Sequence, residues 1–145
     1  RHLYPGADIP VIQMSIDYSK KPQYHFDLAK QLQKLREKGV LIIGSGNIVH
    51  NLRMVDFKKI NKIGYGYDWA VEAREKTNNW LLDGNFQNLI DYHKQGTSLQ
   101  YAVPTPEHYL PLIYTLGLKE NSESLSLFND ELIGGSLSMT SVRIG

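Results

Sequence analysis

Residues 40–47, VLIIGSGN, decide the fold that the sequence predicts. The four apolar residues at 40–43 form a continuous run of the kind found in strands that are covered on both faces. The glycine-rich residues 44–47 follow at once, which is typical of a loop at the carboxyl end of a buried strand. Open α/β sheets bind their ligands at this end. We therefore expect a buried strand that leads directly into a functional loop.

A second strand and a helix precede this segment. Residues 9–16, IPVIQMSI, are rich in β-forming residues, and Ile12, Met14 and Ile16 alternate on one face. Between the two strands, apolar residues recur at helical spacing over residues 23–38. A strand, a helix and a strand joined by short connections predict a right-handed parallel βαβ unit, and so an α/β fold.

The rest of the chain predicts helices followed by two strands. Helices are expected at 68–82 with Asp68 as the cap, at 86–92, and from Thr105 to Gly117 with a bend at Pro111. Residues 125–127 and 137–139 alternate as two short final strands that would pair with each other. Because no repeat or linker is present, residues 1–145 are expected to form a single domain or one portion of a domain.

Composition limits the classes of function. The 145 residues are 41% hydrophobic and 21% charged, which is typical of a soluble globular chain. With 16 basic and 15 acidic residues, the net charge of +1 does not favour nucleic acid as a partner. No apolar run approaches the roughly 20 residues that span a bilayer and no leader is recognisable, so we expect a cytoplasmic protein without a membrane partner. Since cysteine is absent, a metal would be held by His, Asp or Glu, which favours iron, manganese or zinc.

Two of the five histidines stand where their side chains can be aimed at a site. His50 follows the glycine loop at 44–47, and His108 is expected in the first turn of the helix beginning at Thr105, where the helix dipole favours a neutral ring. A neutral imidazole is the form that binds metals, and His50 can also move a proton near neutral pH. Alternatively, both are ordinary polar residues near helix starts. Two histidines alone do not complete a metal site.

Other motifs give weaker signals. The glycine loop resembles a dinucleotide-binding loop, but Val49 stands in place of the third glycine. Ser45 lacks the glycine spacing of a hydrolase nucleophile. His25, within a predicted helix, and His93, near a turn, are expected to be solvated.

Four stretches together resemble a known family. They are residues 7–17 (ADIPVIQMSID), 46–53 (GNIVHNLR), 104–112 (PTPEHYLPL) and 135–139 (GSLSM). In order and spacing they are similar to the C-terminal half of the LigB / DOPA 4,5-dioxygenase family of extradiol dioxygenases. The resemblance implies an α/β fold with a mixed central sheet and flanking helices, of which this chain would be the C-terminal portion.

The resemblance also implies a function and roles for particular residues. It implies an extradiol ring-opening dioxygenase that acts on a catechol such as DOPA, using dioxygen and a non-haem metal, Fe(II) in active enzymes and zinc in some purified proteins. His50 and His108 would be metal ligands, and His50 would also be the catalytic proton carrier. Asn51 and Tyr109 are candidates for orienting the histidines, and Arg53 is a candidate for attracting a substrate carboxylate.

The other histidines of the family lie in N-terminal motifs that do not occur in this sequence. We therefore expect the chain alone to be inactive, and either to sit beside a missing N-terminal half or to self-associate through an apolar flank. Two alternatives stay open: a non-catalytic metal or small-molecule binding module of the same fold, and a zinc-dependent hydrolase.

Overall fold

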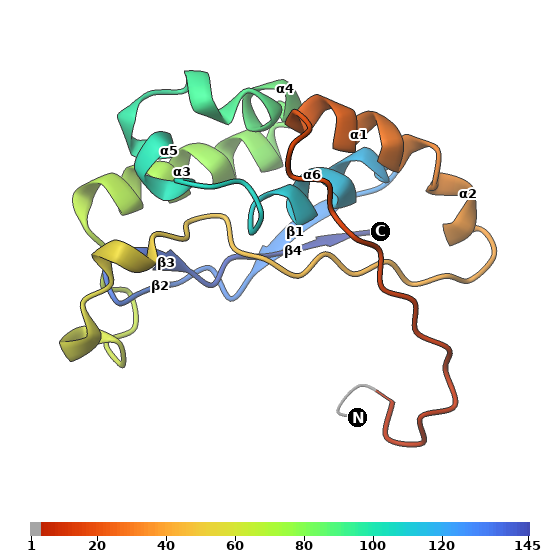
Figure 1. The fold of residues 1–145 in the computed structure, drawn as a ribbon, viewed down its shortest axis with the longest axis horizontal. Helices are drawn as coiled ribbons and strands as arrows, with labels where there is room; N and C mark the ends of the chain where they lie inside the picture. Colours follow the sequence, from red (N-terminus) through yellow and green to blue (C-terminus); the bar gives the residue numbers. More distant parts are fainter. Residues whose placement is uncertain (1–3) are drawn as a thin grey trace.

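In the computed structural model, which describes residues 4–145, a layer of helices lies over two small β-sheets (Figure 1). The segment around residues 40–50 runs along the same side of the helices as the strands, and the N-terminal segment leaves the body of the molecule. The helices are α1 Pro22–Lys30, α2 Gln33–Arg36, α3 Asp68–Leu82, α4 Phe86–Ile90, α5 Thr97–Ala102 and α6 Leu110–Gly117, with short 3₁₀ turns at Leu52–Met54, Phe57–Lys59 and Tyr92–Lys94. The strands are β1 Leu125–Phe128, β2 Leu132–Ile133, β3 Leu137–Ser138 and β4 Ser141–Ile144.

Each of the two sheets contains two antiparallel strands. β1 pairs with β4, placing Leu125 opposite Ile144, and β2 pairs with β3. The predicted pairing of 125–127 with 137–139 is therefore wrong. Gly134 and Gly135 have φ values of 58° and 81°, which glycine adopts without strain, so the chain turns back there and pairs β3 with its neighbour β2.

The mixed central sheet predicted for the α/β fold is not formed within residues 4–145, whose strands make only these two small sheets. Residues 9–16 and 40–43 are extended but have no strand partner, so the predicted βαβ unit is also absent. A strand exists only when a second strand pairs with its backbone. The side chains of Ile12 and Leu41 are 92% and 65% exposed, so these segments lack the cover that their sequences predicted.

Local sequence patterns predict where the helices lie but are wrong about some of the helix ends. α3 has the predicted bounds, although Tyr67 rather than Asp68 occupies the N-cap position. The single helix predicted over 23–38 is interrupted between α1 and α2. α6 begins at Leu110 rather than near Thr105, so Pro111 lies in its first turn, where the missing N–H of proline breaks no helical hydrogen bond.

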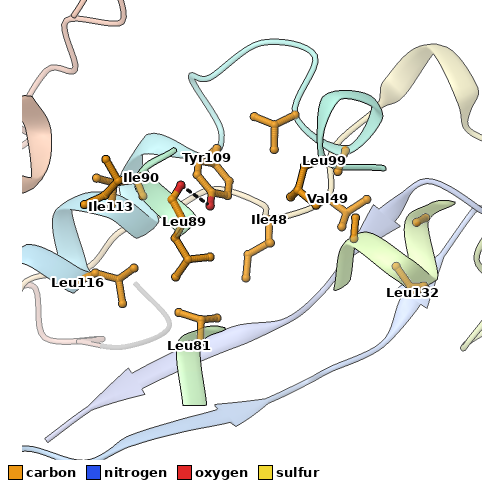
Figure 2. Packing of buried hydrophobic residues seen from close by; sticks show 14 residues of the cluster. Ile48, Val49, Leu81, Leu89, Ile90, Leu99, Tyr109, Ile113, Leu116 and Leu132 are labelled. Carbon is orange, nitrogen blue, oxygen red and sulfur yellow. Dashed lines mark hydrogen bonds between the residues drawn. The ribbon is translucent and has the colours of Figure 1, made fainter. Parts of the chain in front are cut away.

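The main hydrophobic core lies between the helices and the strands (Figure 2). Its buried side chains include Leu81 of α3, Leu99 of α5, Ile113 and Leu116 of α6, and Ile48 and Val49 from the loop. Ala73 of α3 is fully buried, whereas Trp69 and Trp80 are only partly buried against this core. Because Ile48 and Val49 are fixed in the core, the backbone entering His50 is fixed as well.

A second, smaller cluster joins α1 to α6. Ala29, Tyr114 and Leu118 are buried in it, and Ile16 and Ile42 pack against it. The prediction that His25 is solvated is wrong: its side chain has no exposed surface, and its Nδ1 lies 3.0 Å from the Tyr114 hydroxyl. His25 is on the face of α1 that packs against α6, which the sequence pattern did not reveal. His93 is exposed, as predicted.

Within the described residues, no helix combines the length and apolar character needed to cross a bilayer.

Candidate functional site

The backbone of residues 46–51 brings the two candidate histidines together. The His50 N–H donates to the carbonyl of Ala102 at the end of α5 (2.8 Å), and His50 also forms an antiparallel bridge with Leu137 of β3. The Asn47 N–H donates to the carbonyl of His108, again at 2.8 Å. The loop that follows residues 40–43 is thus tied both to the end of α5 and to the turn that carries His108.

The imidazole rings of His50 and His108 lie side by side. Their centroids are 4.0 Å apart and their planes are inclined by 39°. This confirms the expectation that two residues distant in sequence converge at one place. His50 is half-buried and His108 is exposed, so the pair opens onto the surface of the chain.

His108 occupies a turn rather than a helix. Residues 107–109 form this turn immediately before α6, so the prediction that placed His108 in the first helical turn is wrong. The Tyr109 and Leu110 N–H groups both donate to the Pro106 carbonyl at 2.9 Å, which closes the turn. The position of His108 is therefore set by this turn and by the hydrogen bond from the Asn47 N–H to the His108 carbonyl, and not by α6.

Burial and neighbouring charge favour the neutral form of His50. Burial lowers the pKa of His50 below its ordinary 6.5, and the adjacent His108 lowers that pKa further, whereas Glu107 acts in the opposite direction. The Glu107 carboxylate has a pKa below its ordinary value, chiefly because Thr105 donates a hydrogen bond to it at 2.7 Å. A neutral imidazole keeps a lone pair free, so His50 can bind a metal or accept a proton.

Asn51 is fixed directly beside His50. Its side chain is 6% exposed, and its Nδ2 donates to the Tyr101 carbonyl at 2.9 Å. Ser136 holds the Asn51 backbone at both ends: its carbonyl accepts from the Asn51 N–H, and its hydroxyl donates to the Asn51 carbonyl at 2.8 Å. Asn51 Oδ1 is buried without a partner among the described residues. The residue that follows His50 therefore carries one buried acceptor without a hydrogen-bond partner among the described residues.

The other two candidate residues are placed differently. Tyr109 is 1% exposed and its hydroxyl donates to the Leu89 carbonyl at 3.0 Å, so its polar atom is bound inside the core (Figure 2). Burial raises the pKa of Tyr109 well above its ordinary value. Arg53 is exposed on the 3₁₀ turn Leu52–Met54 and forms no ion pair within residues 4–145. Its guanidinium is free to meet a negatively charged group.

Sequence reasoning missed three residues that shape this site. Ser136 and Ser138 hold the loop, because Asn47 Nδ2 donates to the Ser138 carbonyl at 2.8 Å and Ser136 bonds Asn51. Glu107 modifies the pKa of His50. Each lies inside one of the stretches that carry the family resemblance, but short polar residues give no signal of a non-local partner.

The imidazoles of His50 and His108 are donors of the kind that bind transition metals, but two donors are too few for a stable site. Imidazole nitrogen suits iron and zinc, and the two rings lie side by side with their centroids 4.0 Å apart. Among residues 4–145, however, no group of three or more His, Asp or Glu side chains is placed to hold a metal. A stable site requires at least three protein ligands. The described part of the chain therefore places two imidazole rings together without a third such donor beside them.

Comparison with known proteins identifies the class to which this arrangement belongs. Residues 1–138 match the family described as "Catalytic LigB subunit of aromatic ring-opening dioxygenase", and the chain belongs to this LigB family. It is 42% identical over 148 residues to a "4,5-DOPA dioxygenase extradiol" of Escherichia coli K12, and 28% identical over 141 residues to a protein of the same description from Beta vulgaris.

These relatives are longer than this chain. The matches cover 99% of the chain but 52% of the Escherichia coli protein, and 97% of the chain but 51% of the Beta vulgaris protein. The crystal structure of an uncharacterized Escherichia coli K12 protein, 37% identical, superposes with a TM-score of 0.86 over 99% of this chain and 58% of its own. The chain therefore spans about half the length of the relatives it matches.

Proposed function

We propose that this chain provides part of the active site of an extradiol dioxygenase that opens the ring of a catechol such as DOPA. The observation that carries the proposal is the 4.0 Å approach of the His50 and His108 rings in a member of the LigB family. Two relatives described as 4,5-DOPA dioxygenases support the choice of substrate class.

In this proposal His50 and His108 are ligands of a non-haem metal, Fe(II) in the active enzyme, with zinc as an ion that the same nitrogens accept. When bound, the metal supplies a template that holds the catechol and dioxygen together and exchanges electrons with them. The remaining ligands come from outside the described residues, because those residues hold no third donor near the pair.

The residues of this chain handle the proton and the orientation of the substrate. His50 accepts a proton from a catechol hydroxyl at its free nitrogen and later returns a proton to the product, a role that its lowered pKa permits near neutral pH. Asn51 positions His50 through their shared backbone and offers its free Oδ1 as an acceptor. Arg53 attracts the carboxylate of an amino-acid catechol. Tyr109 holds the turn of His108 from inside the core.

A complete protein is needed to test this function. The test protein is a chimera in which this chain replaces the matched part of the Escherichia coli relative. The unmatched half of that relative then supplies the residues that this chain lacks. Loaded with Fe(II), the chimera is expected to consume dioxygen and open the ring of DOPA, whereas residues 1–145 alone are expected to be inactive. The colour of the ring-opened product measures ring opening, and an oxygen electrode measures the consumption of dioxygen independently.

Three outcomes would contradict the proposal. Turnover of DOPA that is equally fast without dioxygen would indicate a metal-dependent hydrolase. A folded chimera that binds metal but consumes no oxygen with any catechol would indicate a binding module. Ring opening by residues 1–145 alone would show that the donor set is complete within this chain.

A further inference from the structure

β3 and the residue before it lie opposite the loop that carries His50. Leu137 of β3 forms an antiparallel bridge with His50. Ser136 and Ser138, on either side of Leu137, are buried, with exposed fractions of 0% and 1%. Buried hydroxyl groups are almost always hydrogen-bonded, so the partners of these two serines show which part of the loop they hold.

Ser138 holds the loop on the N-terminal side of His50. Its N–H donates to the Val49 carbonyl at 3.0 Å, and its Oγ accepts from the Val49 N–H at 3.4 Å. The Val49 carbonyl and the His50 N–H belong to one planar peptide group, and the His50 N–H donates to the Ala102 carbonyl. Both polar atoms of the peptide group that enters His50 are therefore bonded.

Ser136 holds the loop on the C-terminal side of His50. Its carbonyl accepts from the Asn51 N–H at 3.1 Å, and its hydroxyl donates to the Asn51 carbonyl at 2.8 Å. These two bonds act on successive peptide groups and so fix the φ and ψ angles of Asn51, −118° and 86°, from which the chain turns into Leu52–Met54. His50 therefore lies between two peptide groups whose directions are set by the stretch around β3.

The direction of the His50 side chain depends on these bonds. Because side chains occupy a few staggered rotamers, a rotation of the backbone moves the whole imidazole ring with it. His108 is held separately, by its own turn and by the hydrogen bond from the Asn47 N–H. The 4.0 Å separation of the two ring centroids is therefore kept only while the backbone around His50 is fixed.

Loss of the Ser136 hydroxyl would not leave a buried carbonyl unpaired. The Asn51 carbonyl also accepts from the Met54 N–H at 3.1 Å within the 3₁₀ turn. Because an unpaired buried acceptor is what makes the loss of a hydrogen bond costly, we expect Ser136→Ala to fold. In this variant Asn51 would keep its bond within the turn but lose one of its two bonds to residue 136.

We propose that Ser136 is a positioning residue: its hydroxyl, acting through Asn51, keeps the His50 imidazole beside that of His108. The effect of Ser136 on turnover rests on the proposed function. Its effect on the geometry of the two rings does not, so the two effects are tested separately.

NMR of residues 1–145 without metal or substrate tests the geometry alone. The ring protons of His50 and His108 are expected to give a nuclear Overhauser effect, called the ring NOE, because the ring centroids are 4.0 Å apart. Ser136→Ala should lose most of the ring NOE. Its Asn51 amide should exchange at least about tenfold faster, since the peptide groups around Asn51 are less restrained.

Kinetics of the Fe(II)-loaded chimera test the role in turnover. Ser136→Ala is expected to lower kcat at least about tenfold, because a displacement of about 1 Å in a catalytic group is costly. KM for DOPA should change by less than about twofold, since the buried Ser136 hydroxyl is bonded to Asn51 and does not bind the substrate itself. If the chimera without this substitution consumes no dioxygen, the proposed function fails, whereas the ring NOE still tests the geometry.

Thr77→Val is the matched control. The Thr77 hydroxyl is also fully buried and also donates to a backbone carbonyl at 2.8 Å, that of Ala73 within α3. Its loss should leave the ring NOE and kcat unchanged, even where the thermal midpoint falls. The comparison separates the specific place of the Ser136 hydroxyl from a general loss of rigidity.

Three results would overturn the proposal. A folded Ser136→Ala variant that keeps the ring NOE overturns the positioning role, and one that loses the ring NOE but keeps kcat overturns the role in turnover. Equal losses in Thr77→Val would show that any buried hydroxyl has the same effect. If Ser136→Ala does not fold, Ser136→Cys replaces it, because a thiol is only a weak donor, and the same results then decide.

Discussion

His25 is an imidazole without exposed surface that joins α1 to α6. Its Nδ1 meets the Tyr114 hydroxyl, and its Nε2 is buried with no hydrogen-bond partner among the described residues. Burial lowers the pKa of His25 below its ordinary 6.5, while the backbone of Lys20 and the charge of Asp17 act in the opposite direction. The fold therefore accommodates the neutral ring and disfavours its protonated form.

We expect His25 to make the chain less stable in mild acid. The pKa of His25 is lower in the folded state than in the unfolded chain. The stabilising contribution of its neutral ring is therefore fully present above pH 6.5 and is lost as the pH falls below 6.5. Urea unfolding at about pH 7.5 and pH 5.5 should give a lower free energy at the lower pH, and His25→Leu should reduce this difference. The exposed His93→Leu serves as the control. A His25→Leu variant with the full acid dependence would contradict the assignment.

His50 is expected to matter for turnover far more than for folding. In the Fe(II)-loaded chimera, His50→Ala should lower the rate of ring opening at least about 100-fold, because the proton carrier and a metal ligand are both lost. The free energy of unfolding should change by less than about 1 kcal/mol, since the ring is only half-buried. Kinetics and urea unfolding of the same samples separate the two effects. Normal turnover in this variant would exclude the catalytic role.

The loop at residues 44–47 is held so close to α6 and its preceding turn that positions 44 and 46 have no room for a side chain. A Cβ on Gly44 would lie 2.7 Å from the Pro111 carbonyl oxygen, and a Cβ on Gly46 would collide with the carbonyl oxygen of His108. These are backbone atoms and cannot rotate away. Glycine at these positions lets the loop carry His50 up to His108.

Gly46→Ala is therefore expected to separate the two histidines. The added methyl group must push residue 46 away from the His108 carbonyl, which should destabilise the chain by about 1–3 kcal/mol and weaken metal binding in the chimera. Gly6→Ala is the control, because its added Cβ would meet only the side chain of Asp8, at an ordinary 3.4 Å. Equilibrium unfolding and metal titration provide the measurements. Unchanged metal affinity in Gly46→Ala would show that the close approach is not needed.

The whole chain is expected to bind metal weakly until its missing donors are supplied. Residues 4–145 place only the His50 and His108 rings together, and two imidazoles give little gain over the hydrated ion. Anaerobic titration with Fe(II), or calorimetry with zinc, should show at least about 100-fold tighter binding by the chimera than by residues 1–145. His108→Ala should abolish that gain, whereas His93→Ala should not. Equally tight binding by residues 1–145 would mean that the ligand count is wrong.

Much of this protein is determined by short stretches of sequence. The bounds of α3 follow from apolar residues at helical spacing, a signal that lies within the helix itself. The LigB family is recognisable because four short stretches keep their order, and two of them contain His50 and His108.

Only the tertiary structure decided which distant segments meet. The pairing of β1 with β4, the burial of His25 against Tyr114 and the bonds between Ser136 and Asn51 join residues far apart in the sequence. Residues 9–16 and 40–43 illustrate the same limit, because they have the composition of buried strands but have no strand partner within the described residues. A sequence pattern indicates which backbone conformation a segment favours and which of its faces is apolar. The hydrogen bonds that turn such a segment into a sheet come from another strand, and its identity is set by the packing of the whole molecule.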